Sequence, residues 1–353
     1  NDVRCHSIEH KLGVHGSLTC TMVYGDKGGA VGWLVGEENR GLMAMFTMMN
    51  NARLAVALQG VSIAERATQQ AIAYAMDRRQ GKAPGSKSDG ISPIIEHPDV
   101  KRMLATMRAY TRASRAICYM LAAEIDRAHL GATADEQKAG NARASLLTPI
   151  AKAFSTDIGN EVASLGVQVH GGMGFVEETG IAQHYRDARI ITIYEGTTGI
   201  QANDLIGRKV LRDGGRSMAA LIGQIADVCD ELERSGDAQL KAIGQRLRDG
   251  SRCMADAVEW IMATGSRDLN AVLAGAVPFL HLCGVVCGGW QMARAALTAQ
   301  RKLAAGDGDL PFYRAKIATA RFFADQDLTR AAGLRDAAIH AAAGTMALSE
   351  EQF

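Results

Sequence analysis

The sequence has almost no net charge. It contains 39 Lys and Arg residues against 38 Asp and Glu residues, a formal charge of +1. The strongly basic balance that favours nucleic acid or anionic membranes is therefore lacking. Internal repeats and low-complexity tracts are lacking as well. With 47% hydrophobic and 22% charged residues, the 353-residue chain can bury large cores and is long enough for about two domains.

Cysteine is scarce and scattered. The seven cysteines are odd in number and do not form a disulfide framework, which indicates a reducing compartment and a cytoplasmic location. Cys283 and Cys287 are four residues apart in an apolar segment, so we expect them to pack in a core. Cys5, His6 and His10 could ligate a metal, but no second ligand cluster completes such a site, and none is predicted.

Targeting and membrane segments are not predicted. The chain starts at Asn1 without Met, signal or transit segment, and we expect that an N-terminal portion of the protein precedes it. Residues 269–293 contain no Asp, Glu, Lys or Arg, yet they include Pro278, polar side chains and four glycines. This composition favours a central helix of a soluble bundle over a membrane span.

The first 36 or so residues have the composition of β-strands. Residues 18–24 and 30–35 are rich in β-branched and aromatic side chains, and Gly25-Asp26-Lys27-Gly28-Gly29 is typical of a turn between them. Two or three strands do not form a stable domain alone. Residues 1–38 are therefore predicted to be the incomplete tail of a larger, middle β domain.

The rest of the chain has helical periodicity, and the predicted fold class is mainly α. A first helix is expected from about residue 40 to 76, and a second opens at Pro98. A third is expected to begin at Thr148-Pro149, a plausible cap and first-turn proline. Residues 39–212 are thus predicted to form a long-helix bundle. After Gly214-Gly215, residues 213–353 are predicted to form an additional helical domain with helices near 216–234, 238–264, 268–304 and 311–343.

Glu195 is the most informative single residue. It lies between Tyr194 and the Gly196-Thr197-Thr198-Gly199 turn, after an apolar run. A carboxylate on such a turn can be desolvated, and desolvation makes it a stronger base. That chemistry suits abstraction of a carbon-bound proton beside a carbonyl. The alternative is an exposed loop glutamate.

Other polar positions each allow two interpretations. Arg78 and Arg79 end a helix, where they could complement its dipole or hold a diphosphate. Arg53 could form a surface salt bridge or an inward-facing anion clamp. The run from Gly171 to Gly174 follows a predicted helix, so it is either a helix C-cap or a place where a ligand approaches the backbone. It is not a Rossmann fingerprint, which would follow a strand.

Taken together, these segments resemble the acyl-CoA dehydrogenase family. The matching blocks occur in order over most of residues 1–212, and the tail after about residue 213 looks like the extra helical domain of the longer subgroup, which includes the 3-methylthiopropanoyl-CoA dehydrogenases. The blocks are Lys11–Ser17, Asn50–Arg53, Asp77–Gly81, Ile150–Phe154, Gln168–Phe175, Arg186–Ala188 and Tyr194–Thr197.

The resemblance implies an oxidoreductase that uses FAD. Glu195 would be the catalytic base that takes the α-proton of an acyl-CoA thioester, while hydride passes to the flavin and a trans-2-enoyl-CoA forms. The substrate positions implied are Asn50, Arg53, Tyr194 and Gly196. The FAD positions implied are Arg78, Gln80, Gln168, Gly171, Gly172, Thr197 and Gly199, of which the first five would reach the cofactor of a neighbouring subunit.

The same resemblance implies the partners. An electron-transfer flavoprotein would accept the electrons, and the protein would be a homodimer or homotetramer, with no nucleic acid or membrane partner. The sequence departs from the family pattern in two places, where Gln80-Gly81 lacks a common aromatic residue and Gly199 replaces a common glutamine. We also expect the chain as given to bind FAD weakly or not at all and to have no turnover. The alternative function is a non-catalytic helical oligomerisation module of the same fold.

Overall fold

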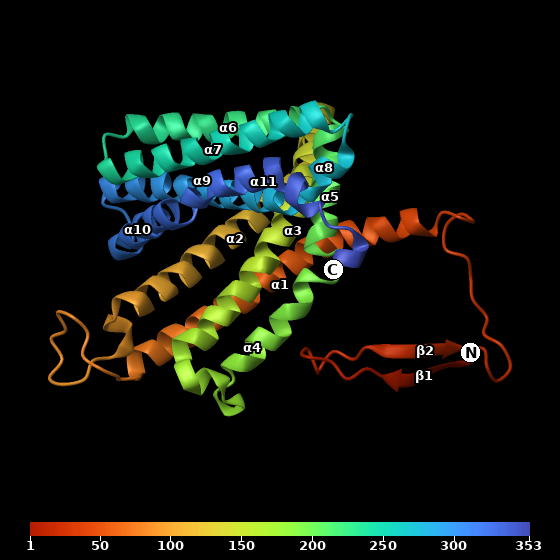
Figure 1. Cartoon of the computed structure of the whole chain (residues 1–353), viewed down its shortest axis with the longest axis horizontal. Helices are drawn as coiled ribbons and strands as arrows, with labels where there is room; N and C mark the ends of the chain where they lie inside the picture. Colours follow the sequence, from red (N-terminus) through yellow and green to blue (C-terminus); the bar gives the residue numbers. More distant parts are fainter.

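Two groups of helices make up most of the molecule (Figure 1). The structure is a computed structural model that describes residues 1–353, apart from the side chain of Asn50. The first group contains the long helices α1 (Gly41–Asp77), α2 (Pro98–Leu130) and α3 (Ala134–His170), which pack against one another. The second group, which begins at α6 (Arg216–Arg234), lies across one end of the first. Buried residues of both groups join in one hydrophobic core.

Helix α1 packs against α2 and α3 and buries a narrow stripe of alanines. Ala64, Ala67, Ala71 and Ala75 are all fully buried, at the three- and four-residue spacing of one helix face. The helix ends at Asp77 because Arg78 adopts an extended backbone conformation. The predicted limits of this helix, residues 40 and 76, are confirmed to within one residue, and the predicted start of α2 at Pro98 is confirmed as well.

The crossing of α1 and α3 is unusually close at Gly60. A Cβ atom placed on Gly60 would lie 2.2 Å from the Ser155 carbonyl oxygen, and one on Gly159 would lie 3.0 Å from the Gly60 Cα. Real side-chain carbons do not approach a backbone this closely, so hydrogen is the only substituent that fits at position 60. The contact fixes the middle of α3, which contains Lys152, against the middle of α1.

Helix α3 starts earlier than the sequence predicted. Thr133 is its N-cap and accepts a hydrogen bond from the Glu136 N–H, while the Glu136 carboxylate accepts one from the Ala132 N–H. This pair satisfies two backbone donors at the helix start. The prediction of a start at Thr148-Pro149 was therefore wrong, and Pro149 lies inside the helix, fully within the buried part of the bundle.

The strand pairing also differs from the prediction. Strand β2 (Cys20–Tyr24) is present, but it pairs antiparallel with β1 (Val3–Ile8), so that Tyr24 faces Val3. Residues 30–35 form no strand, and the Val31 N–H and carbonyl bond to the side chain of Asn1. The β pair lies beside the helices (Figure 1), and the Asp187 carboxylate of α4 (Ile181–Ala188) accepts from the Val14 N–H at 2.6 Å.

The second group contains two helices at their predicted limits and two predicted helices that are interrupted. Helices α6 and α7 (Ala238–Thr264) cover the predicted residues 216–234 and 238–264. The stretch 268–304 divides at Gly275 into α8 (Leu269–Ala274) and α9 (Ala276–Ala305). The stretch 311–343 divides near Asp327 into α10 (Leu310–Gln326) and α11 (Ala331–Thr345). A buried bond of the Asp327 side chain, described below, accompanies this second division.

Helix α9 is the central helix of the second group. It is long and apolar enough to cross a membrane by length and composition, and 83% of its most apolar window is buried inside the protein. Cys283 and Cys287 are both fully buried on it, so the prediction of core packing is confirmed. Burial raises the pKa of the Cys287 thiol to about 12, which keeps it protonated and unreactive at neutral pH.

A buried polar contact links the two groups of helices. The Tyr110 hydroxyl of α2 donates to Asp327 Oδ1 at 2.6 Å, and Arg330 Nη1 donates to the Tyr110 hydroxyl at 3.0 Å. Asp327 is only 3% exposed. Desolvation raises the pKa of the Asp327 carboxyl to about 6, against the opposing effects of Tyr110 and Arg330.

The raised pKa predicts a pH dependence of stability. Because the folded-state pKa of Asp327 is about 6 and its ordinary value is 3.8, the folded protein binds more protons than the unfolded chain between these pH values. This group therefore lowers the unfolding free energy as pH rises from about 4 to about 6. Asp327→Asn should remove that slope, as measured by urea unfolding at several pH values. The exposed control Asp89→Asn should keep the wild-type dependence of the unfolding free energy on pH. The same dependence in Asp327→Asn would contradict this role.

Candidate active site

The Glu195 turn has an unusual backbone conformation. It joins a 3₁₀ turn (Arg189–Thr192) to α5 (Thr198–Asp204). Glu195 has φ +55° and Gly196 has φ +92°, so two successive residues are left-handed. For a residue with a side chain this conformation is uncommon and costs free energy. Strain of this kind persists where the surroundings fix the backbone, and functional turns are a frequent location.

The carboxylate of Glu195 is partly buried. Its Oε2 atom is inaccessible to solvent and has no hydrogen-bond partner among the described residues. Buried acceptors in folded proteins are nearly always satisfied, so an orphaned carboxylate oxygen needs a reason. An exposed loop glutamate, the alternative raised by the sequence, does not fit this burial. A bound molecule that supplies a proton or a hydrogen-bond donor to Oε2 is compatible with this burial.

Two side chains from neighbouring helices hold the turn. The Tyr194 hydroxyl donates to Gln59 Oε1 of α1, and burial raises the pKa of that phenol. Gln201 of α5 is fully buried, and its Nε2 donates to the Glu195 carbonyl at 3.2 Å and the Gly196 carbonyl at 3.4 Å. A Cβ on Gly196 would lie 2.5 Å from that nitrogen. Both the positive φ and the close approach therefore require glycine at 196.

Lys152 of α3 is the third residue that holds the turn. It is fully buried, and its Nζ donates to the Ile191 carbonyl at 2.9 Å and the Gly196 carbonyl at 2.7 Å. Desolvation lowers the pKa of the ammonium to about 8, although the charges of Asp157 and Glu195 oppose the decrease. The sequence analysis gave no role to Lys152 or Gln201. The sequence signal that could have identified Lys152 is a lysine on the apolar face of a helix that is predicted to be buried.

The start of α5 is connected to the second helical group. Thr197 is the N-cap, and its Oγ1 accepts from the Ile200 N–H at 3.3 Å. The next residue, Thr198, donates from Oγ1 to Asp157 Oδ1 at 3.1 Å, and His281 Nε2 of α9 lies 3.0 Å from Asp157 Oδ2. A hollow of about 700 Å³ opens beside this connection, and its lining includes Tyr185, Thr197, Gly199 and His281. The predicted FAD positions Thr197 and Gly199 thus border open space next to Glu195.

Arg53 faces inward. It is 5% exposed, and its Nη1 lies 3.5 Å from Asp204 Oδ2 at the end of α5. The surface salt bridge considered from the sequence is therefore wrong, because both partners are buried. The inward-facing position agrees with the other interpretation, and a contact with substrate stays a prediction. The side chain of Asn50, the other predicted substrate position on α1, lies outside the described residues.

The remaining predicted FAD positions lie together where α1 and α3 end. The ring of Tyr74, near the end of α1, stacks on His170, the last residue of α3, with centroids 4.2 Å apart. This stack brings two exposed segments to one end of the molecule: Arg78 and Gln80 after α1, and Gln168, Gly171 and Gly172 around the end of α3. Gly171 has φ +58° and ends α3, as a helix C-cap does.

The two sets of FAD positions are far apart along α3. Thr198, between Thr197 and Gly199, bonds to Asp157 of α3, and Asp157 and Gln168 are eleven residues apart in the numbering. At a rise of 1.5 Å per residue this spacing corresponds to about 16 Å. The structure therefore brings together Glu195, Tyr194, Gly196, Thr197 and Gly199 at one place, and the other five FAD positions at another.

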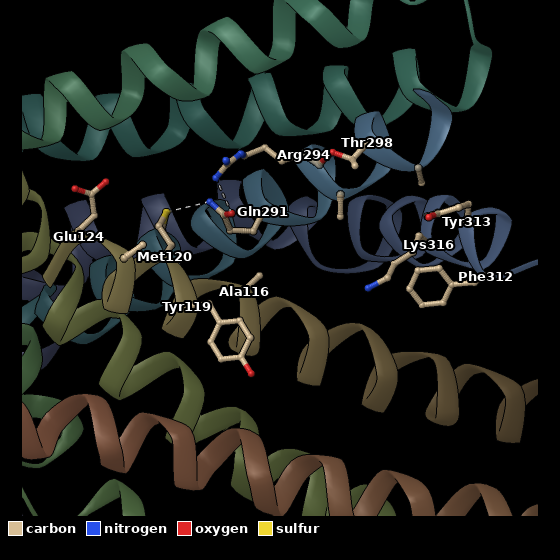
Figure 2. Close-up of a pocket in the computed structure, with 13 residues that line it drawn as sticks. Ala116, Tyr119, Met120, Glu124, Gln291, Arg294, Thr298, Phe312, Tyr313 and Lys316 are labelled. Carbon is tan, nitrogen blue, oxygen red and sulfur yellow. Dashed lines mark hydrogen bonds between the residues drawn. The ribbon is translucent and has the colours of Figure 1, made fainter. Parts of the chain in front are cut away.

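A separate groove lies between the two helical groups (Figure 2). It has a volume of about 610 Å³ and is bordered by α2, α9 and α10. Figure 2 shows Gln291, which donates to Met120 Sδ and accepts from Arg294, in its middle, and Phe312 with Lys316 at one end. None of the predicted site residues lines it, so the groove is distinct from the Glu195 site.

Comparisons with known proteins identify the family. Residues 39–211 match the family model described as acyl-CoA dehydrogenase, C-terminal domain, and residues 221–349 match the one described as acetyl-CoA dehydrogenase C-terminal like. The chain belongs to the acyl-CoA dehydrogenase family. It is 51% identical to the 3-methylmercaptopropionyl-CoA dehydrogenase of Ruegeria pomeroyi, over 93% of this chain and 55% of that protein.

Two further matches agree. A broad-specificity linear acyl-CoA dehydrogenase of Mycobacterium tuberculosis is 34% identical over 92% of this chain and 55% of its own length. The chain thus spans about half the length of the curated relatives that it matches. An acyl-CoA dehydrogenase of Bacillus anthracis, crystallised in complex with FAD, has the same fold, with a TM-score of 0.76 and 22% identity over 98% of this chain and 58% of that one. The predicted fold class, mainly α with a small β part, is confirmed.

Proposed function

We propose that the intact protein to which this chain belongs is an FAD-dependent acyl-CoA dehydrogenase, and that Glu195 is its catalytic base. The single observation that most supports this role is the buried, orphaned Oε2 of Glu195 on a strained turn. A carboxylate that lacks an internal partner is available to a proton of a bound molecule. Similarity to proteins that are named as acyl-CoA dehydrogenases supports the substrate class.

The residues of the turn would act on the substrate as follows. The Glu195 carboxylate would take the proton from the α-carbon of the thioester. The electron pair of that C–H bond, shared with the carbonyl as negative charge develops, would form the α,β double bond as hydride leaves the β-carbon. Partial burial limits the access of water to this carboxylate. Hydrogen-bond donors at the thioester oxygen, including the Glu195 backbone N–H, would stabilise the developing negative charge. FAD, when bound, supplies the acceptor for the hydride that leaves the β-carbon.

The residues present are compatible with FAD. Thr197 and Gly199 border open space beside Glu195, and side chains at Gly171 or Gly172 would meet no other atom within 4 Å. We propose that the first pair holds the cofactor of its own subunit. Because the second set lies about 16 Å away along α3, we propose that Arg78, Gln80, Gln168, Gly171 and Gly172 hold the cofactor of a neighbouring subunit. A homodimer or homotetramer and an electron-transfer flavoprotein as acceptor are part of the same proposal.

The alternative, a non-catalytic oligomerisation module, is not favoured. A scaffold gains nothing from a left-handed glutamate with a buried free oxygen, since both features cost stability. The two proposals predict different flavin absorbance spectra after an acyl-CoA thioester is added to the intact protein.

The test is an anaerobic titration of the intact protein with saturated acyl-CoA thioesters of increasing chain length. The flavin absorbance near its visible maximum should fall on mixing with at least one of these thioesters, and the matching 2-enoyl-CoA should form. Free CoA and the corresponding free acid are the controls and should leave the spectrum unchanged. A preparation that contains no flavin, or one in which no thioester alters the flavin band, would contradict the proposed activity.

A further inference from the structure

Lys152 is placed to fix the carbonyl groups on both sides of the catalytic turn. Its Nζ bonds to the carbonyls of residues 191 and 196, which bracket Glu195. The carbonyl of Glu195 itself is bound by Gln201. Three carbonyls around the base are therefore directed toward buried donors, and the peptide groups of the turn cannot rotate without breaking these bonds.

A buried lysine needs a reason to be retained. Transfer of an ammonium group from water into a protein interior is costly, and a well-packed apolar side chain of similar volume is often neutral or stabilising at such a position. Lys152 is fully buried and lies close enough to Glu195 and Asp157 for both carboxylates to favour its charged form. Its two bonds end on backbone carbonyls of the turn and not on a carboxylate. Its position therefore serves the shape of the turn more directly than the stability of the bundle.

The strain at Glu195 makes this support necessary. A left-handed glutamate returns to a right-handed or extended conformation unless its neighbours prevent it. Rotation about φ and ψ of Glu195 would move its carboxylate by several ångströms, and a displacement of about 1 Å from a productive geometry can already cost about 100-fold in rate. The buried Lys152 donor on helix α3, which itself is fixed against α1 at Gly60, opposes this movement together with Gln201.

We propose that Lys152 is a positioning residue that holds Glu195 in its reactive conformation through the Ile191 and Gly196 carbonyls. This inference rests on the proposed function of Glu195. Lys152 itself touches neither the substrate nor the cofactor in this role. It acts only through the backbone of the turn.

Substitution with methionine tests the proposal, because Lys152→Met keeps the length and bulk of the side chain and removes its donors. In the intact protein the rate of flavin bleaching by acyl-CoA should fall about 10- to 100-fold. The KM for acyl-CoA and the bound FAD should change by less than about twofold. The unfolding midpoint should change little, because the loss of two hydrogen bonds and the removal of a buried charge act in opposite directions. Lys152→Gln, which restores one donor, should recover part of the rate and guards against a folding defect of the first variant.

Lys209→Met is the matched control. This half-buried lysine donates to Ser145 Oγ at 2.8 Å, away from the turn, and burial lowers its pKa as it does for Lys152. Its loss should leave the bleaching rate unchanged. If Lys152→Met bleaches at the wild-type rate, or loses FAD or substrate affinity without a loss of rate, the proposal is wrong.

A second substitution separates the two proposals. When Glu195 is already Gln, Lys152→Met should cause no further loss of rate, because a positioning residue acts only through the base that it holds. Equal losses in both backgrounds would show that Lys152 acts independently of Glu195 and would contradict the inference. If Glu195→Gln alone bleaches normally, the proposed function itself fails, whatever Lys152→Met does.

Discussion

Glu195→Gln should reduce the rate of flavin bleaching by acyl-CoA about 10²- to 10⁴-fold in the intact protein, the range that general base catalysis contributes. The substitution replaces one carboxylate oxygen with an amide and keeps the size of the side chain. The backbone φ of +55° and the bonds from Lys152 and Gln201 do not depend on the carboxylate. The loss should therefore fall on the chemical step, with acyl-CoA affinity and FAD content close to wild type.

The exposed glutamate of α7 is the control for this variant. Glu259→Gln makes the same chemical change on the second helical group, where the side chain is exposed to solvent. It should bleach at the wild-type rate. Stopped-flow absorbance under anaerobic conditions measures both variants. A Glu195→Gln protein that bleaches as fast as Glu259→Gln would exclude Glu195 as the base.

Gly60→Ala should cause the largest loss of stability among single methyl additions to α1. The new carbon would lie 2.2 Å from the Ser155 carbonyl oxygen and 2.6 Å from the Ser155 carbonyl carbon. These are backbone atoms of α3, so the two helices have to separate. We expect the unfolding free energy to fall by about 3 kcal/mol, at the upper end of overpacking effects. Because α3 contains Lys152, the bleaching rate should fall as well.

A second helical glycine separates packing from helix propensity. Gly223 lies inside α6, is exposed, and would place a Cβ with no atom within 4 Å. Gly223→Ala should raise the unfolding free energy by about 0.5–1 kcal/mol, because alanine favours the helix over glycine. Urea unfolding of the intact protein measures both changes. The packing argument is contradicted if Gly60→Ala is as stable as wild type, or if it raises the unfolding free energy as Gly223→Ala is expected to do.

Local signals predicted much of the fold. Helices α1, α6 and α7 begin and end within about one residue of their predicted limits, and α2 begins at its predicted residue, Pro98. Periodicity and a clear stop occur together in these segments, as at Asp77. Helix α3 was predicted too short because Thr148-Pro149 resembles a helix start, whereas the real start depends on Thr133 and Glu136. Tertiary packing tolerates the interior proline, which a local rule does not anticipate.

The strand pairing and the division of the last helices needed tertiary information. Strand β2 was predicted correctly, but its partner is the chain start and not residues 30–35, a choice set by long-range bonds such as that of Asn1 to Val31. The interruption near Asp327 accompanies a hydrogen bond to Tyr110, more than 200 residues earlier in the chain. No pattern within a short window contains either contact.

The candidate site was predicted in part. The resemblance directed attention to Glu195 and its neighbours, and the structure places Tyr194, Gly196, Thr197 and Gly199 around it. The sequence did not predict the left-handed backbone of Glu195 or the hydrogen bonds from Lys152 and Gln201 to the carbonyls of the turn. It also did not predict the burial of Arg53 against Asp204. These features depend on the packing of α1, α3 and α5, which brings residues some 40 to 150 positions apart into contact.

Exchange of the substrate α-proton with solvent tests the role of Glu195 most directly. The intact protein is mixed with a saturated acyl-CoA in D₂O without an electron acceptor, and deuterium at the α-carbon is followed by NMR. A carboxylate base at residue 195 predicts steady incorporation with wild type and with Glu259→Gln, and a rate at least about 100-fold lower with Glu195→Gln. Incorporation by Glu195→Gln at the wild-type rate would contradict the proposal that this carboxylate removes the proton.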